Sequence, residues 1–318
     1  MAANSNIAAQ PMAERAKDPV TELVTIGDDL AEATIAPAIG GGLASYDLIQ
    51  DGRKENIFWP ARSLDRSRPF DLALINLVPW SGRISGGGFR FAGRFHPLAP
   101  NVEGELLPIH GGGFSSIWTL SEKTPSEARL TLRSDGPGPY LYDAEVGYRL
   151  RRGALSIRLC VTHRGEAPMP YGLGLHPWLP RTPATRLQAP AERATLEDHQ
   201  HLPAGQVDVA SRESWNFNRA RRLPDAWINN DFSPWPGTAR IVWPERSLSL
   251  EIDTEGDPSL TSYLLYSPAA DAEFFCFEPV THLVDAHNRA GGPEANGLKI
   301  LQSDQSFSIT CKFSPERL

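Results

Sequence analysis

Cysteine is scarce in this chain of 318 residues. The three cysteines, Cys160, Cys276 and Cys311, stand in apolar runs and form no CxxC pair. An odd number of isolated cysteines fits neither a disulfide framework nor a zinc ribbon. We therefore expect reduced thiols that belong to the core.

Excess positive charge and long apolar runs are lacking as well. The chain carries 31 Lys and Arg residues against 38 Asp and Glu residues, a formal net charge of -7, so it lacks the positive field that phosphate backbones require. No stretch approaches the roughly 18 apolar residues of a membrane span, and the N-terminal part contains no basic segment followed by a long apolar core. These absences predict a cytoplasmic protein with neither nucleic acid nor a membrane as partner.

Helical periodicity and internal repeats are also missing, which disfavours a parallel α/β architecture. The dominant pattern is an alternation of apolar and polar residues. It runs through residues 144–150 and, after Arg151-Arg152-Gly153, through residues 155–161, which predicts a β-hairpin. Shorter alternating runs occur at residues 130–132, 248–252 and 307–313.

Strands with one polar face favour antiparallel sheets that pack face to face. We therefore predict an all-β fold, a large antiparallel β-sandwich. Residues 1–20 have no sustained apolar period and are expected to form a flexible leader. Residues 21–318 are expected to form a single domain, because no linker-like stretch interrupts the alternation.

Two glycine-rich turns, at residues 85–89 and 110–114, could suggest phosphate loops. Neither has Walker spacing or a GxGxxG motif that leads into a helix, so this function is disfavoured. The glycines after His110 instead allow close backbone packing that leaves the imidazole at a strand end, within reach of a polar ligand. A structural histidine is the alternative.

His176 and Glu278 are singular ionisable residues in apolar surroundings. His176 lies within the segment 171–180, and Glu278 follows the apolar run 274–277 and precedes Pro279. A buried ionisable group costs free energy unless it is hydrogen-bonded or used in chemistry. Both residues are therefore candidates for catalysis, and the alternatives are a core histidine and a carboxylate held by backbone N–H groups.

The segment 197–201, Glu-Asp-His-Gln-His, is a possible metal site by composition. Its HxH pair lacks a clear third ligand, and the segment is typical of a solvated loop. We therefore expect no metal there.

Several short motifs follow one another in a fixed order: LPIHGGGFSSIW at residues 107–118, GLGLHPWLP at 172–180, FEPVTH at 277–282 and AHN at 286–288. In order and spacing they resemble the aldose 1-epimerase (galactose mutarotase) family. The resemblance covers nearly all of residues 21–318 and also includes residues 40–46, Asn76, residues 82–84, Gly93, Asn101 and residues 297–301.

This resemblance implies a large antiparallel β-sandwich whose concave face holds a sugar cleft. It further implies that Glu278 is the general base and His176 the general acid. His110 and Arg83 would then bind the sugar or its transition state, and Trp178 would provide an apolar wall for the C–H face of the sugar. The implied partner is a small-molecule sugar, a free aldose.

One segment departs from the family pattern. Relatives place a sugar-binding Asp a few residues before a Phe, and aligning Phe232 within residues 228–237 puts Asn229 at that position. Asp231 is two places away and would reach the cleft only if the strand register differs. An amide at this point removes negative charge from a cleft that contains Arg83, which would favour an acidic or otherwise modified sugar.

Interconversion of anomers needs a base that removes the C1 hydroxyl proton and an acid that protonates the ring oxygen. An ionised Glu278 and a protonated His176 suffice, so no metal and no cofactor is expected.

The alternative is a non-catalytic carbohydrate-binding or sugar-sensing protein on the same fold, which the presence of both residues disfavours. An accessory β-sandwich of a larger carbohydrate-active enzyme is disfavoured because the sequence contains no second catalytic domain. The sequence leaves the oligomeric state open.

Overall fold

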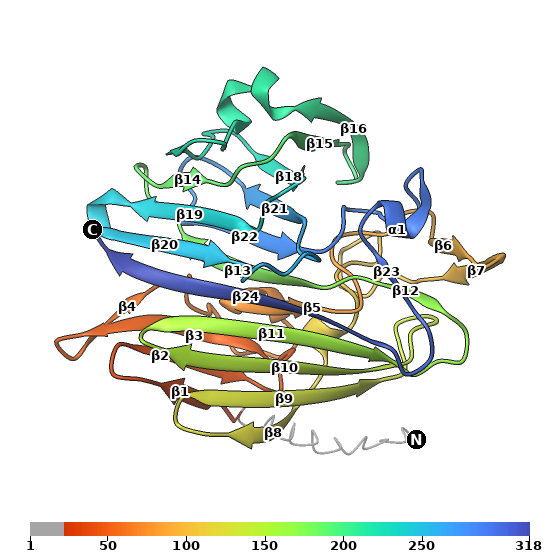
Figure 1. Cartoon of the computed structure of the whole chain (residues 1–318), viewed down its shortest axis with the longest axis horizontal. Coiled ribbons are helices and arrows are strands. Elements are labelled where there is room, and N and C mark those ends of the chain that lie inside the picture. The colour runs from red at the N-terminus through yellow and green to blue at the C-terminus, as the bar shows by residue number, and fades with distance from the viewer. Residues whose placement is uncertain (1–21) are drawn as a thin grey trace, which may run out of the picture.

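A computed structural model describes residues 22–318, and the leader expected at residues 1–20 lies outside the described residues. The described chain is built mainly from antiparallel strands in two large sheets that lie face to face (Figure 1). The all-β sandwich predicted from the alternation is thereby confirmed.

The first sheet has eleven strands, and its spatial neighbours come from distant parts of the chain. In spatial order these strands are β1 (Val24–Gly27), β2 (Ala31–Ala36), β3 (Gly42–Gln50), β5 (Leu74–Leu77), β13 (Gly174–Pro180), β22 (Phe274–Val280), β21 (Ser262–Ser267), β18 (Ile228–Ser233), β15 (Arg193–Glu197) and β16 (Pro203–Asp208), with β4 (Arg53–Asn56) paired to β3.

The second sheet has nine strands and contains the predicted hairpin, in which Val146 of β10 lies opposite Leu159 of β11. In spatial order its strands are β17 (Arg221–Arg222), β14 (Arg186–Gln188), β19 (Thr238–Trp243), β20 (Leu248–Asp253), β24 (Ser306–Arg317), β11 (Ala154–His163), β10 (Tyr142–Arg151), β9 (Glu127–Ser134) and β8 (Thr119–Lys123).

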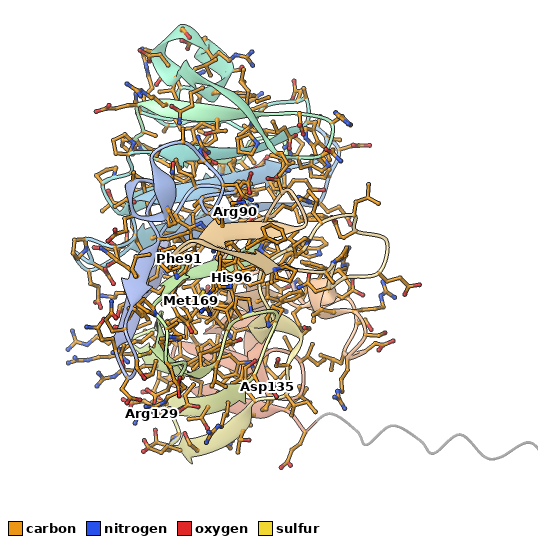
Figure 2. The ribbon with its side chains drawn as sticks, turned by 90° about the vertical axis from the view of Figure 1, so that its right-hand side faces the viewer. Arg90, Phe91, His96, Arg129, Asp135 and Met169 are labelled. Carbon is orange, nitrogen blue, oxygen red and sulfur yellow. The ribbon has the colours of Figure 1, made fainter. Side chains whose placement is uncertain are left out.

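Two small two-stranded sheets and a few short helical turns complete the described chain. Figure 2 shows one pair from the side, marked by Arg90, Phe91 and His96. None of the helices in residues 22–318 has the length and apolar character that a membrane crossing needs. The remaining elements are β6 (Gly88–Phe91) with β7 (Arg94–Pro97), β12 (Met169–Tyr171) with β23 (Lys299–Leu301), α1 (Gly292–Ala295) and 3-10 turns at Pro69–Asp71, Gly113–Ser115, Val209–Ser211, Glu213–Trp215 and Pro244–Arg246.

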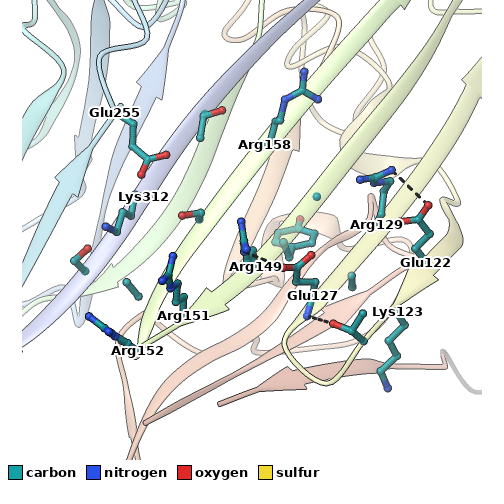
Figure 3. A pocket seen from close by; sticks show the side chains of 18 of the residues that line it. Glu122, Lys123, Glu127, Arg129, Arg149, Arg151, Arg152, Arg158, Glu255 and Lys312 are labelled. Carbon is teal, nitrogen blue, oxygen red and sulfur yellow. Dashed lines mark hydrogen bonds and ion pairs between the residues drawn. The ribbon is translucent and has the colours of Figure 1, made fainter. Parts of the chain in front are cut away.

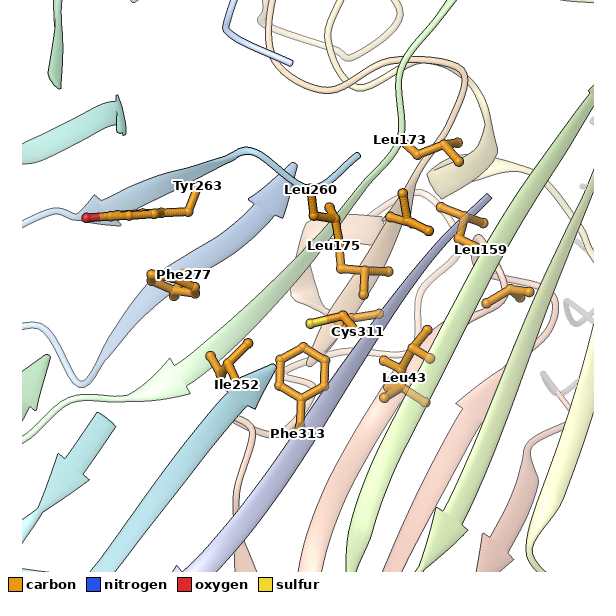
Figure 4. Packing of buried hydrophobic residues seen from close by; sticks show 14 of the residues in the cluster. Leu43, Leu159, Leu173, Leu175, Ile252, Leu260, Tyr263, Phe277, Cys311 and Phe313 are labelled. Atoms are coloured by element: carbon orange, nitrogen blue, oxygen red, sulfur yellow. The ribbon is translucent and has the colours of Figure 1, made fainter. Parts of the chain in front are cut away.

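The main hydrophobic core fills the space between the two sheets. Leu175 and Phe277 extend into it from the first sheet and meet Ile252 and Phe313 from the second (Figure 4). Burying each such side chain contributes about 1.5–3 kcal/mol. The packing of these two apolar faces is therefore the main force that holds the sheets together.

The cysteines follow the strand alternation. All three are free, and Cys276 and Cys311 are buried as expected. The expectation of a core thiol is wrong for Cys160, which is only partly buried. Its neighbours Leu159 and Val161 point into the core, so the alternation of β11 turns Cys160 to the opposite face.

The same alternation gives the central strands β13 and β22 two different faces. Leu175 and Phe277 enter the core, so the residues that follow them, His176 and Glu278, lie on the face away from the second sheet. Trp178 pairs with Cys276 in the strand register, and that register sets His176 opposite Glu278. Two sequence motifs about 100 residues apart are thus brought together.

Leu175→Ala should lower the free energy of unfolding by about 2–5 kcal/mol, because it removes buried apolar volume between the sheets. Urea unfolding measures the change. The matched variant Leu120→Ala removes a side chain that is 38% exposed and should stay within about 0.5 kcal/mol of wild type. Equal losses in the two variants would contradict the assignment of the core.

Candidate active site

A cavity of about 360 Å³ opens on the outer face of the first sheet. Six of the seven site residues predicted from the sequence line it, and the seventh, Asp231, does not. The six are Arg83, His110, His176, Trp178, Asn229 and Glu278. The fold therefore assembles in one place the side chains that the motifs had singled out.

A larger hollow of about 1090 Å³ lies on the outer face of the second sheet (Figure 3). Several of its charged side chains pair with one another, as Arg149 does with Glu127 at 2.8 Å and Arg129 with Glu122 at 3.5 Å. These pairs are exposed to solvent, where ion pairs contribute little, and no histidine lines the hollow. The smaller cavity is therefore the candidate active site.

His176 and Glu278 form a buried pair on the floor of this cavity. The distance between His176 Nε2 and Glu278 Oε1 is 3.3 Å, and the two side chains are 9% and 2% exposed. Within the described chain, His176 Nδ1 and Glu278 Oε2 have no hydrogen-bond partner. A buried polar atom without a partner costs about 1–3 kcal/mol, so both atoms are suited to bind a ligand.

Burial sets the protonation of this pair. It lowers the pKa of His176 to about 3 and raises the pKa of Glu278 well above its ordinary value, against the opposing effect of Arg83. Both shifts disfavour charge in a medium of low polarity. Both shifts therefore favour a resting pair of a neutral imidazole beside a protonated carboxyl group, opposite in direction to the ionised Glu278 expected from the sequence. The pair still holds one proton.

Aromatic rings surround the pair. The Trp178 indole stacks on the His176 ring with 4.0 Å between centroids and 22° between planes. Phe70, Tyr266 and Phe274 also line the cavity. These rings keep water away from the ionisable groups and offer flat apolar faces to the C–H groups of a ligand.

His110 is held in a strained backbone conformation with φ +58°. Asn101 fixes its flanks, accepting a hydrogen bond from the Ile109 N–H at 2.8 Å and donating to the carbonyl of Gly111 at 2.6 Å. The Gly82 N–H donates to His110 Nδ1 at 3.1 Å. Burial lowers the pKa of His110 well below its ordinary value, so the neutral ring carries its proton on Nε2. That N–H is the donor available to a ligand.

The glycine that follows His110 allows the close backbone packing predicted from the sequence. Gly111 has φ +70°, and a Cβ there would lie 2.4 Å from the carbonyl oxygen of Val78. Only glycine fits such a position without moving the backbone. The glycine-rich turn thus places the imidazole of His110.

Arg83 contributes a cation whose charge is already balanced. Its Nε and Nη2 donate to the two carboxylate oxygens of Glu105 at 3.1 and 2.9 Å. This two-point contact fixes the guanidinium plane and leaves about three N–H groups for a ligand. Glu105 was not predicted, because nothing in its local sequence marks a partner for a distant arginine.

Asn229 and Asp231 lie on the same face of β18 but have different surroundings. Asn229 lines the cavity and donates from Nδ2 to Glu197 Oε2 at 2.8 Å. Asp231 is buried, accepts from the Val284 N–H at 3.2 Å, and lies 3.5 Å from Arg289 Nη1. Asp231 therefore supports the loop that carries Val284, and Asn229 is the residue at the cavity, as the alignment on Phe232 predicted.

The segment 197–201 does not match the solvated loop expected from its composition. Glu197 is partly buried and accepts a hydrogen bond from Asn229, and His201 lines the cavity. The pairing of β15 beside β18 brings them there, a long-range contact that composition does not encode. Among residues 22–318 no group of three His, Cys, Asp or Glu side chains is arranged to hold a metal ion.

His282 from the FEPVTH motif has a structural position next to the cavity. Its Nε2 accepts from the Ser81 N–H at 3.0 Å, so its Nδ1 carries the proton and donates to the Leu283 carbonyl at 2.9 Å. Both ring nitrogens are therefore used in the neutral form. Ser81 directly precedes Gly82 and Arg83, so this histidine holds in place the segment after β5 that carries these two residues.

The fold belongs to a class of known sandwich structures. A crystal structure of a protein from Escherichia coli K12 superposes with a TM-score of 0.85 at 28% identity, covering 93% of this chain and 99% of that one. A galactose mutarotase-like protein from Clostridium acetobutylicum superposes with a TM-score of 0.78 at 17% identity, covering 93% and 95%. At 17% identity the second likeness concerns the fold alone.

The sequence profile described as Aldose 1-epimerase matches residues 22–314. The chain therefore belongs to the aldose 1-epimerase family, as the motifs had indicated. It is also 34% identical over 242 residues to the uncharacterised protein YphB of Escherichia coli K12, covering 74% of this chain and 81% of YphB.

The stability of the protein should depend on pH through His282. Burial lowers the pKa of His282 from 6.5 to about 4 in the folded state. Below pH 6.5 the unfolded chain takes up a proton that folded His282 does not, so stability is complete above pH 6.5 and falls by about 2 kcal/mol by pH 5. Urea unfolding across this range should show a shallower slope in His282→Gln, by about one proton. The same slope in both proteins would refute this role.

Proposed function

We propose that this protein catalyses the interconversion of the α and β anomers of a free aldose. The observation that carries the proposal is the buried His176–Glu278 pair, which offers an acid and a base in a cavity of about 360 Å³, a volume suited to a small ligand. Membership of the aldose 1-epimerase family supports it.

The chemistry uses the single proton of the pair. Transfer of that proton from Glu278 Oε1 to His176 Nε2 gives a carboxylate and an imidazolium without changing the net charge, and the nearby Arg83 favours the carboxylate. Glu278 then removes the proton of the C1 hydroxyl while His176 protonates the ring oxygen. The C1–O1 double bond forms as the bond between C1 and the ring oxygen breaks, which yields the open-chain aldehyde.

Ring opening returns the pair to its resting form, with a protonated Glu278 and a neutral His176. Rotation about the C1–C2 bond presents the other face of the aldehyde. Glu278 then protonates the aldehyde oxygen while His176 removes the proton from the ring hydroxyl, and the ring closes to the other anomer. Positioned acid–base catalysis typically contributes about 10²- to 10⁴-fold, which suits a reaction that is already facile.

The other cavity residues hold the sugar. The Nε2–H of His110 and the unpaired N–H groups of Arg83 donate to sugar oxygens and stabilise negative charge that develops on them. Trp178 provides an apolar wall beside His176. We assign no metal and no cofactor to the reaction, because the acid and the base are both side chains.

The charges of the cavity favour a neutral aldose over the acidic sugar suggested by Asn229 alone. Arg83, the arginine beside the pair, is balanced by Glu105 at 2.9 Å, whereas Arg62 shares the carboxylate of Asp71 with Arg68. Glu197 adds a further carboxylate behind Asn229. An anionic sugar would therefore meet a compensated Arg83 at the pair and a carboxylate behind Asn229.

Glu278→Gln should reduce the kcat for mutarotation by at least about 10²-fold while changing sugar affinity only a few-fold, because an amide keeps the shape but accepts no proton at neutral pH. Polarimetry of freshly dissolved α-anomers measures the rate, and calorimetry measures affinity. Glu127→Gln, on the outer face of the second sheet, is the matched control and should behave as wild type. Binding of aldoses by a wild-type protein that turns over none of them would identify a sugar-binding protein instead.

The pH profile of kcat/KM should have a broad plateau. The one-proton pair gains a second proton only as the pH approaches about 3, where His176 protonates, and loses its proton only near the raised pKa of Glu278. Ordinary pKa values of about 4.3 and 6.5 would instead give a narrow bell with a decline above pH 6.5. Equal values of kcat/KM at pH 5.5 and 7.5 are expected, and a tenfold fall between them would contradict the resting protonation.

A further inference from the structure

Glu197 stands behind three side chains that line the cavity and binds all of them. Its Oε1 accepts from the indole N–H of Trp227 at 2.5 Å, and its Oε2 accepts from His201 Nδ1 at 2.7 Å and from Asn229 Nδ2 at 2.8 Å. His201, Asn229 and Trp227 belong to the cavity wall, whereas Glu197 does not. One carboxylate thus fixes three groups that a ligand would touch.

Each hydrogen bond decides what the donor presents to a ligand. Because Asn229 Nδ2 is bound to Glu197, its amide oxygen is the free acceptor. His201 donates from Nδ1 to Glu197, which fixes the plane of its ring and leaves Nε2 without a bond to this carboxylate. Trp227 is 45% exposed, yet its plane is fixed by the Glu197 bond and by stacking on His201 with 5.6 Å between centroids. The group therefore offers an amide oxygen and an imidazole nitrogen beside an aromatic surface.

The turn that carries His201 is a second, independent observation. It joins β15 to β16, and Asp198 closes it by accepting from the N–H groups of Gln200 at 2.7 Å and Leu202 at 3.0 Å. His201 has φ +60°, a left-handed conformation that costs a residue other than glycine about 1–2 kcal/mol. A strained position that glycine would relieve is occupied here by an imidazole directed to the cavity wall.

The strand register places this group away from the acid–base pair. Asn229 of β18 lies opposite Tyr266 of β21, and Tyr266 lies opposite Cys276 of β22. Cys276 is two residues before Glu278 and on the same face of the strand. Asn229 is therefore two strands across and two residues along from Glu278, a Cα separation of ~12 Å. A sugar ring with hydrogen bonds at both ends spans such a distance, so an aldose with C1 at Glu278 would extend its far end toward Asn229.

We propose that Glu197 is a positioning residue that presents His201, Asn229 and Trp227 as a recognition surface for the end of a neutral aldose remote from C1. The proposal rests on the proposed function, which locates C1 at Glu278. The amide oxygen of Asn229 and the Nε2 atom of His201 form hydrogen bonds with hydroxyl groups, which can both donate and accept, and the aromatic face contacts the C–H groups between them. The surface therefore selects aldoses that keep their hydroxyls at the far end over the corresponding deoxy sugars.

The test compares Glu197→Gln and His201→Ala with wild type on an aldohexose and on its 4-deoxy and 6-deoxy analogues. Gln keeps one acceptor oxygen and replaces the other with an NH2 donor, so it cannot accept from all three donors, and at least one of them loses its fixed orientation. We expect KM for the parent sugar to rise about tenfold while kcat changes less than about threefold. The preference for the parent over one or both deoxy analogues should shrink in both variants.

Two controls separate positioning from a general structural effect. Glu192→Gln and His199→Ala alter exposed side chains beside or within the same hairpin and should keep wild-type KM and selectivity. Urea unfolding should show all four variants folded at the assay temperature. A fall in kcat with unchanged KM, or unchanged selectivity in folded Glu197→Gln, would overturn the proposal.

The proposed function and this inference fail in different ways. A wild type that binds aldoses without turnover would refute the epimerase activity alone, and dissociation constants for the same sugars would then replace KM. The expected result in that case is still a roughly tenfold weaker Kd in Glu197→Gln. A wild type that neither binds nor converts any of the sugars would overturn both.

Discussion

The burial of an imidazole against a carboxyl group on one sheet face is the constraint on which the rest of the site depends. His176 and Glu278 are brought together because β13 and β22 are neighbours whose other faces supply Leu175 and Phe277 to the core. The packing that holds the sandwich together therefore also sets the distance between the imidazole and the carboxyl group. Burial disfavours charge on both groups, lowering the pKa of His176 and raising that of Glu278, which suits the one-proton pair of the proposed mechanism.

Two kinds of residue surround this pair: side chains that line the cavity, and residues that hold those side chains in place. His110 is placed by Asn101 and Gly111, Arg83 by Glu105, and the strand end before Arg83 by His282. Glu197 has the same relation to His201, Asn229 and Trp227 on the opposite side of the cavity. Each of these groups on the cavity wall has a fixed orientation before a ligand binds, which is what the proposed catalysis by positioning requires.

Those parts of the fold that depend on local sequence patterns, such as strand alternation and glycine turns, could be predicted from the sequence. The alternation in residues 144–150 and 155–161 was enough to predict the central hairpin, and the glycines after His110 were enough to predict close backbone packing, which the structure places at Val78. The motifs were also enough to identify six residues that line one cavity, out of seven predicted site residues. What could not be predicted depends on contacts between distant segments: the pairing of Glu105 with Arg83, the hydrogen bond between Glu197 and Asn229, and the burial that raises the pKa of Glu278. Asp231, which the sequence placed at the cleft only under a different strand register, contacts Arg289 and Val284, more than fifty residues later in the chain.

The proposed function requires that this buried pair transfer protons to and from a free aldose. Magnetisation transfer between the α and β anomer signals in proton NMR measures this exchange directly at equilibrium, without any change in overall composition. The account predicts an exchange rate that increases in proportion to protein concentration for at least one neutral aldose, at an unchanged anomer ratio. An exchange rate equal to that of buffer, for aldoses that demonstrably occupy the cavity, would contradict it.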